Sequence, residues 1–88
     1  MSQLIPLYGF LEGDTIGLIV LAHDDDTIAR VADGLQHSAR WRVTKCPRVR
    51  VFHGSRELDA SHTVAQAGLA PLERIDVRAA GDPGDGVP

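Results

Sequence analysis

Residues 4–22 read LIPLYGFLEGDTIGLIVLA, and this stretch consists of two apolar runs separated by the turn sequence EGD at 12–14. Leucine, aromatic and β-branched side chains dominate the runs, which predicts strands over 4–11 and 15–22. Gly and Asp tolerate the backbone angles of a tight turn, so the two strands are expected to pair as an antiparallel hairpin. Pro6 lacks an N–H donor and is therefore expected at a sheet edge or a bulge.

The segment 27–38, TIARVADGLQHS, is predicted to be an amphipathic helix. Its apolar residues recur at the spacing of one helical stripe: Ile28, Val31, Ala32 and Leu35. Asp26 or Thr27 is the expected N-cap, because short oxygen-bearing side chains accept hydrogen bonds from the first free amides. Gly34 costs about 1 kcal/mol relative to alanine inside a helix, so it is expected to allow a close approach to the sheet.

Three further strands are predicted downstream, after an irregular segment at 40–47. The sequence VRVFH at 49–53 has strand character, and Gly54-Ser55 turns the chain into a short return strand at 56–58. Apolar and charged residues alternate in ERIDVR, which predicts a last strand from residue 72 or 73 to 78.

Between these strands, 61–68 is predicted to form one short helical turn. Thr63 and Gln66 have the spacing of a capping box, and Gly68 suits the left-handed residue that follows a helix end. The tail 81–88, GDPGDGVP, is expected to be disordered because glycine, proline and aspartate dominate it.

The predicted order is hairpin, helix, strand, short strand, helical turn and strand. One helix packed over a mixed sheet of four or five strands is the β-grasp, or ubiquitin-like, architecture, which is an α+β fold. The helix supplies the crossover that lets the last strand run parallel to the first. We therefore expect a single ubiquitin-like domain over 1–80.

The composition limits what so small a chain does. With 88 residues, about 60% of the unfolded surface can be buried, which suffices for one modest core but not for a multi-step active site. A net charge of −3 argues against nucleic acid and anionic membranes as partners. One cysteine, Cys46, excludes an intrachain disulfide and a cysteine-based zinc site. The N-terminus lacks a signal peptide, and a cytoplasmic location is expected.

No pattern of catalytic residues is found in the sequence. The four histidines have none of the spacings of zinc or di-iron helices: His23, His37, His53 and His62. The cluster HDDD at 23–26 offers oxygen ligands, but adjacent residues seldom converge on one ion, so a solvated helix start is the favoured interpretation. Cys46 has no histidine close in sequence and is interpreted as a structural thiol. We predict no catalytic, cofactor-binding or metal-ligating residue in this chain.

Six of the nine basic residues lie within seventeen positions: Arg40, Arg42, Lys45, Arg48, Arg50 and Arg56. Trp41 and Phe52 lie among them, a pattern found on nucleic-acid-binding surfaces. Two other interpretations are a solvent-facing strand balanced by acidic residues elsewhere and a docking surface for an acidic protein. The negative net charge makes nucleic acid the least favoured of the three.

Both faces of the predicted hairpin are apolar, although one helix covers only one face of a sheet. Large apolar side chains occupy both sets of alternating positions: Leu4, Tyr8 and Phe10 against Ile5, Leu7 and Leu11, and Ile16, Leu18 and Val20 against Ile19 and Leu21. Unless 40–47 or the tail covers the second face, that face indicates a permanent protein partner. Either this apolar face or the basic stretch near Arg48 and Arg50 is expected to dock on the partner, and the candidate docking residues are Tyr8, Phe10, Leu18, Arg48 and Arg50.

Three segments resemble a known family: IPLYGFLEGD at 5–14, DDTIARVA at 25–32 and TVAQAGLAPLERIDV at 63–77. They are similar to the small gamma subunit, system protein B, of bacterial multicomponent di-iron monooxygenases that oxidise toluene, alkenes or isoprene. The similarity spans 4–77, and its last segment is the most specific part. VFHG at 51–54 with ELD at 57–59 also resembles ubiquitin around its third strand, which supports only the fold.

The resemblance implies a noncatalytic ubiquitin-like subunit in a hydroxylase of composition (αβγ)₂, with the alpha and beta subunits as partners. The carboxylate-bridged di-iron centre of such an enzyme lies in the alpha subunit, where O₂ is activated and one oxygen atom enters an alkene or aromatic ring. Electrons come from NADH through a reductase and a Rieske ferredoxin, and a small effector protein regulates turnover. No iron ligand or catalytic residue is carried over to this chain.

Two other functions stay open on the sequence. A free-standing ubiquitin-like adaptor would be a stable monomer without a large partner. A sulfur carrier needs a free C-terminal Gly-Gly, whereas this sequence ends Gly86-Val87-Pro88, which makes it the weaker alternative.

Overall fold

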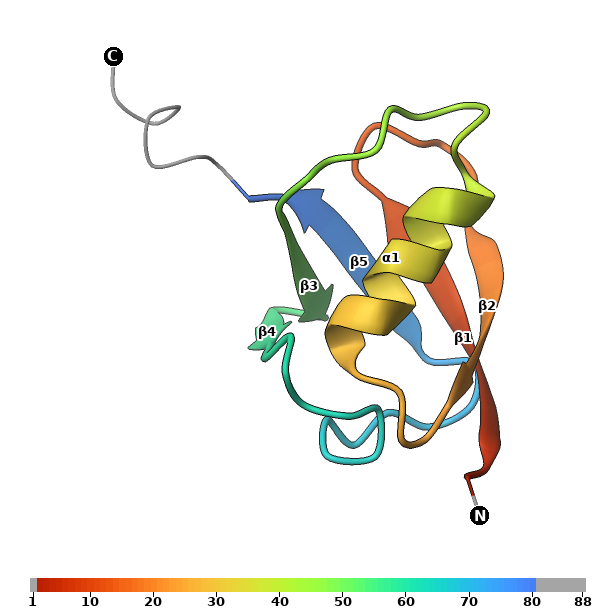
Figure 1. Ribbon diagram of the computed structural model, residues 1–88, viewed down its shortest axis with the longest axis vertical. Helices are drawn as coiled ribbons and strands as arrows, with labels where there is room; N and C mark the ends of the chain where they lie inside the picture. Colours follow the sequence, from red (N-terminus) through yellow and green to blue (C-terminus); the bar gives the residue numbers. More distant parts are fainter. Residues whose placement is uncertain (1, 81–88) are drawn as a thin grey trace.

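The computed structural model describes residues 2–80, which form five strands and one helix (Figure 1). In chain order these are β1 (Leu4–Leu11), β2 (Leu18–His23), α1 (Ile28–Ser38), β3 (Val49–His53), β4 (Arg56–Leu58) and β5 (Arg74–Ala79). Each lies where the sequence predicts an element of its type. The expected disorder of 81–88 concerns residues outside the described part.

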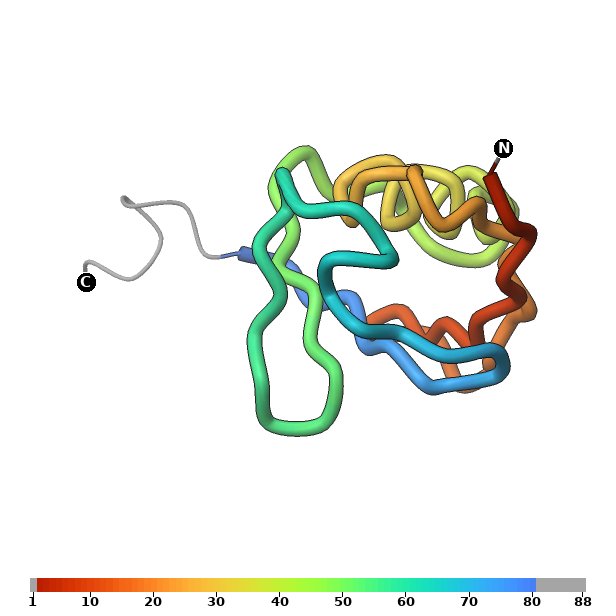
Figure 2. Tube along the Cα trace, turned by 90° about the horizontal axis from the view of Figure 1, so that it is seen from below, coloured from red at the N-terminus to blue at the C-terminus, as the bar shows by residue number. Residues whose placement is uncertain are grey.

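The five strands form one mixed sheet in the order β2-β1-β5-β3-β4. β1 and β5 pair in parallel, with Tyr8 opposite Arg74 and Leu11 opposite Val77, whereas the pairs β1–β2, β3–β4 and β3–β5 are antiparallel. α1 crosses one face of the sheet, and Figure 2 shows the helix and the sheet as two layers. This arrangement is the predicted β-grasp, and its sheet has five strands.

The hydrophobic core lies between α1 and the sheet. The four stripe residues of the helix, Ile28, Val31, Ala32 and Leu35, are each at most 3% exposed, which confirms the helical spacing. Alternate residues of the strands meet them, with Leu7 and Ile75 fully buried. Burying one side chain of this size stabilises a fold by about 1.5–3 kcal/mol, so this single layer supplies most of the stabilisation.

The close approach of α1 to the sheet depends on Gly9 and not on Gly34. A Cβ atom at Gly9 would lie only 2.7 Å from Cδ2 of Leu35, which is fully buried, so Leu35 occupies the space of a β1 side chain. A Cβ atom at Gly34 would meet nothing within 4 Å. The expectation for Gly34 is therefore wrong, because this residue lies on the exposed side of the helix.

Two strand starts differ from the prediction. β2 begins at Leu18 rather than at residue 15, and the N–H of Ile16 instead donates to the Asp14 carboxylate at 3.2 Å, which prolongs the turn. β5 begins at Arg74, opposite Tyr8, so β1 has no neighbouring strand on that side at Pro6. The missing N–H of Pro6 therefore costs no ladder hydrogen bond, which agrees with its expected edge position.

The local capping predictions are confirmed. Thr27 is the N-cap of α1, and its side chain accepts a hydrogen bond from the Arg30 N–H at 3.1 Å. In 61–68 the N–H of Thr63 donates to Oε1 of Gln66 at 2.9 Å, and the N–H of Gln66 donates to Oγ1 of Thr63 at 3.1 Å. The helical turn there is a single one, and Gly68 ends it with a φ of +73°.

Alanine substitutions at the two glycines should have opposite effects on stability. Gly9→Ala forces Leu35 away from β1 and is expected to lower the free energy of unfolding by about 1–3 kcal/mol. Gly34→Ala meets open space and should raise it by about 0.5–1 kcal/mol through helix propensity. Urea unfolding followed by far-UV circular dichroism measures both. Equal effects of the two substitutions would contradict this account of the helix–sheet contact.

Candidate functional site

We call the face of the sheet opposite α1 the outer face. Over β1 and β2 this face is apolar. The strand register places Tyr8 opposite Ile19 and Pro6 opposite Leu21, so these side chains share one face. Four large apolar residues there are 41–63% exposed, and we call them the apolar patch: Leu4, Tyr8, Ile19 and Leu21. Exposure of this size shows that the segment 40–47 does not cover the patch.

An aromatic stack borders the apolar patch. The rings of Tyr8 and Phe10 lie with their centroids 5.5 Å apart and their planes 13° from parallel. A Cβ atom at Gly17 would lie 2.5 Å from Cζ of Phe10 and 2.8 Å from Cε1 of Tyr8. The stack therefore rests directly on the backbone of the turn between β1 and β2, and only glycine leaves room for it.

Arginine side chains occupy the rest of the outer face, on β3 and β5. Three of them stack on aromatic rings, and we call them the arginine cluster: Arg50, Arg74 and Arg78. The Arg74 guanidinium lies 4.0 Å from the ring centroid of Phe10, whereas Arg50 and Arg78 lie 5.3 Å and 4.8 Å from that of Phe52. Such cation–π contacts attract the guanidinium groups to the aromatic rings.

Two carboxylates pair with the arginine cluster. Arg50 makes a two-pronged contact with Glu57 at 2.7 and 3.0 Å, and these hydrogen bonds lower the pKa of the Glu57 carboxyl. Arg74 pairs with Asp76 at 2.9 Å, and that hydrogen bond raises the pKa of the Arg74 guanidinium. Within residues 2–80, no carboxylate forms an ion pair with Arg78.

Leu72, two residues before β5, is an exposed leucine in a strained backbone conformation. Its φ is +65°, a region that glycine adopts readily and that costs other residues about 1–3 kcal/mol. Its N–H donates to the carbonyl of Pro6 at 2.6 Å, which ties its backbone to β1 next to the apolar patch. The side chain is 62% exposed, so burial in the core does not offset the strain.

The structure brings together three of the five residues expected to dock. Tyr8, Phe10 and Arg50 lie on the outer face, whereas Leu18 packs against the core. Arg48 precedes β3 and lines a groove between α1 and β3, which Arg50 lines as well. Grouping Leu18 with Tyr8 is therefore incorrect, because the register puts Leu18 opposite Gly9 on the helix side. The sequence analysis did not single out Ile19 and Leu21, which the structure exposes on the outer face, although their alternation with Val20 was a signal for a shared face.

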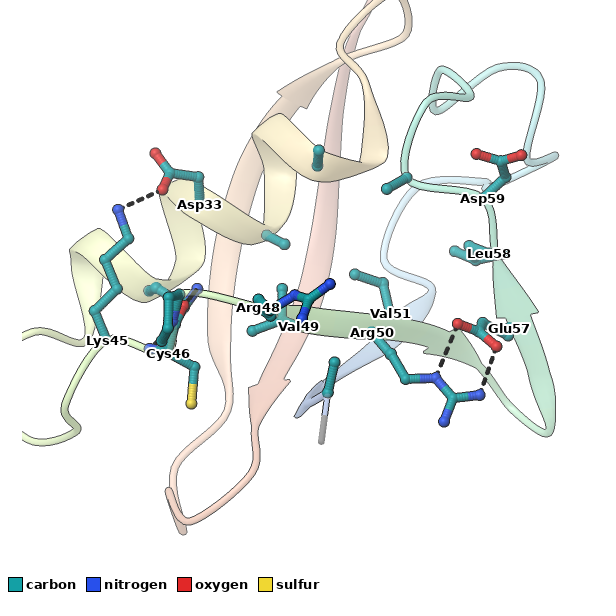
Figure 3. A pocket seen from close by; sticks show the side chains of 16 residues that line it. Asp33, Lys45, Cys46, Arg48, Val49, Arg50, Val51, Glu57, Leu58 and Asp59 are labelled. Carbon is teal, nitrogen blue, oxygen red and sulfur yellow. Dashed lines mark hydrogen bonds and ion pairs between the residues drawn. The ribbon is translucent and has the colours of Figure 1, made fainter. Parts of the chain in front are cut away.

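The groove between α1 and β3 has a volume of about 930 Å³ (Figure 3). Lys45 reaches across it to Asp33 at 2.6 Å, and this contact lowers the pKa of the Asp33 carboxyl. Gln36, only 6% exposed, accepts from the Cys46 N–H at 2.6 Å and donates to the Cys46 carbonyl at 3.2 Å. Cys46 is thus a clamped, partly buried residue, and no histidine lines this groove as a base for it.

Within the described residues, half of the six cations of the basic stretch are neutralised by the chain's own acidic residues. Three of its cations form ion pairs with carboxylates: Arg42 with Asp14, Lys45 with Asp33 and Arg50 with Glu57. Arg40 instead stacks on Trp41, which is 83% exposed, with 5.0 Å between the guanidinium and the ring centroid. This pairing favours the interpretation of a solvent-facing stretch balanced by acidic residues over a nucleic-acid surface.

The cluster at 23–26 forms the turn before α1. The N–H of His23 donates to Oδ2 of Asp26 at 2.8 Å, and the N–H of Gln3 donates to Oδ1 of Asp24 at 3.0 Å. In the part of the chain from 2 to 80, no three His, Cys, Asp or Glu side chains gather as metal ligands would. Nor does that part contain a helix of the length and hydropathy needed to cross a membrane.

The strand order, the single crossing helix and the apolar outer face define a ubiquitin-like β-grasp protein with a surface suited to protein contact. Solved structures confirm the fold. A ubiquitin from Caldiarchaeum subterraneum is 14% identical, with a TM-score of 0.72 over 93% of this chain and 100% of its own. A ubiquitin-like domain of an Arabidopsis thaliana protein is 16% identical, with a TM-score of 0.69 over 85% of this chain and 76% of its own.

The chain belongs to the toluene-4-monooxygenase system protein B family, whose model matches residues 4–78. This match confirms the resemblance to the small subunit of a multicomponent monooxygenase. One chain in a structure described as the toluene 4-monooxygenase HD complex with the inhibitor 4-bromobenzoate is 24% identical. It covers 89% of this chain and 100% of its own, with a TM-score of 0.82. No curated protein matches this chain in sequence.

The Arg42–Asp14 pair predicts a specific dependence of stability on pH. The Asp14 side chain is only 5% exposed, and hydrogen bonds from Arg42 and from the Ile16 N–H lower its pKa, although burial opposes them. A lowered pKa in the folded state adds stability above about pH 4, and this contribution is lost as the pH falls through the folded pKa. The difference in unfolding free energy between wild type and Arg42→Ala should therefore be largest near pH 7.

The same difference should shrink as the pH falls below about 4, measured by urea unfolding in a pH series. The matched control places Arg42→Ala in an Asp14→Asn background, where its effect should not change with pH. A constant difference between wild type and Arg42→Ala across the series would show that the pair does not act through the Asp14 proton.

Proposed function

We propose that this chain is the noncatalytic structural gamma subunit of the hydroxylase component of a di-iron monooxygenase. The observation that carries this proposal is the family match over residues 4–78. A member of this family is a subunit of a monooxygenase system, so its role is expressed within an assembly of several chains.

The chemistry of the described residues supports a structural rather than a catalytic role. Residues 2–80 do not fit a di-iron site, because they contain no cluster of three or more possible metal ligands. Their best-defined carboxylates are already used within the chain: Asp14, Asp33, Glu57 and Asp76 each face a basic side chain. The proposal therefore places the di-iron centre in the alpha subunit.

The proposed assembly contains two copies each of alpha, beta and gamma subunits, with this chain docked on the large alpha subunit. NADH would supply electrons through a reductase and a Rieske ferredoxin, and an effector protein would regulate turnover. The substrate class is an alkene or an aromatic hydrocarbon, and the reaction takes place outside this chain. An exposed apolar sheet face supports docking, because contiguous apolar surface marks protein contacts.

Affinity purification of the tagged chain from its native host tests this function. We expect two larger subunits in amounts equal to the chain, together with protein-bound iron, measured by mass spectrometry and an iron assay. A tagged ubiquitin-like protein of unrelated family, expressed in the same host, controls for nonspecific capture.

Two results would contradict the proposal. Recovery of the chain alone, or with unrelated iron-free partners, would indicate a free-standing ubiquitin-like adaptor. A thiocarboxylate at the C-terminus, detected by mass spectrometry of the intact chain, would indicate a sulfur carrier.

A further inference from the structure

The two parts of the outer face form one continuous surface. Arg74 of β5 lies opposite Tyr8 of β1 in the strand register and stacks on the ring of Phe10. The aromatic stack therefore connects the apolar patch on one side to the arginine cluster on the other. α1 packs on the opposite side of the sheet, so the helix leaves this surface open.

The apolar part of this surface is large for so small a protein. From typical side-chain areas, the apolar patch and Leu72 together expose roughly 500 Å², which equals the largest apolar patch of many monomers. A stable interface takes about 800 Å² from each partner, so this surface supplies more than half of that area. The strained, exposed Leu72 lies at its border, where a partner would bury the side chain.

Within residues 2–80, one cation of this surface has no carboxylate partner. In that part of the chain the three guanidinium groups of the arginine cluster have two carboxylate partners, Glu57 and Asp76, which pair with Arg50 and Arg74. Arg78 lies directly opposite Arg50 in the register of β3 and β5, and like charges in this position repel each other. A carboxylate from outside the chain would relieve this repulsion and pair with Arg78.

We infer that the outer face is the surface that docks on the large hydroxylase subunit. The complementary surface of that subunit is apolar where it meets the apolar patch and bears a carboxylate that reaches Arg78. A second copy of this chain is a poorer match, because the described part of its outer face offers arginines, and its carboxylates there, Glu57 and Asp76, are already paired. This inference rests on the proposed function and adds to it the docking face and the chemistry of the partner.

Co-expression of the tagged chain with its hydroxylase subunits, followed by affinity purification, tests this inference. Ile19→Asp and Leu21→Asp place a charge in the apolar patch at residues that are 51% and 63% exposed, so both variants should fold. Each should reduce recovery of the large subunit about tenfold or more. Arg78→Glu should reduce it as well, whereas Arg78→Lys should retain part of it.

Matched controls lie away from the outer face. Trp41→Asp places a charge at a more exposed apolar residue, and Arg30→Glu reverses a charge on α1; both should recover the large subunit as the wild type does. Far-UV circular dichroism of each isolated variant must show the wild-type spectrum. A variant that unfolds is replaced by Ile19→Ser or Leu21→Ser, which change the patch less.

The outcomes separate the inference from the proposed function. If Ile19→Asp and Leu21→Asp fold and still recover as much large subunit as the wild type does, the assignment of the outer face as the docking face is wrong, but the proposed gamma-subunit function is unaffected. If the wild type recovers no hydroxylase subunit, both are overturned. If the isolated wild type forms a dimer that Leu21→Asp converts to a monomer, the face binds a second copy instead.

Discussion

The contact between Leu35 and Gly9 determines how the rest of this small structure is arranged. Because Gly9 has no side chain, the fully buried Leu35 of the helix packs directly against the backbone of β1. That contact determines which face of β1 packs in the core. Because side chains alternate between the two faces of a strand, it also determines which neighbouring side chains of β1 point to the core and which to the outer face. Since β1 is paired with both β2 and β5, the same assignment passes to the whole centre of the sheet.

The outer face follows from this assignment. Tyr8 and Phe10 lie on the face of the sheet opposite the helix, and their rings pack against the backbone of Gly17. Beyond them, Arg50 and Arg74 each contact an aromatic ring and a carboxylate, which hold their guanidinium groups in place. A surface ordered in this way loses little side-chain entropy on binding, which favours a lasting contact over a transient one.

Most of the fold could be predicted from the sequence, because local patterns specify it: the helical stripe, the Thr63–Gln66 capping box and the alternation around Ile75 all correspond to observed structure. The residues of the outer face were harder to predict. Both faces of the hairpin are apolar, so composition cannot assign Leu18 to the core and Ile19 to the surface, whereas the register with Gly9 and Tyr8 does so. The prediction that Gly34 allows a close approach of the helix to the sheet was wrong for a related reason. The sequence shows that a glycine has no side chain, but it does not show which atoms lie next to that glycine.

The position of Trp41 has a consequence for spectroscopy. It is the only tryptophan, it lies in the segment after α1, and it is already 83% exposed in the folded chain. Unfolding changes its solvent contact very little, so its emission should remain nearly constant while the core melts. What that emission does report is the Arg40 guanidinium above the ring, which makes the fluorophore a sensor of this one segment rather than of the domain.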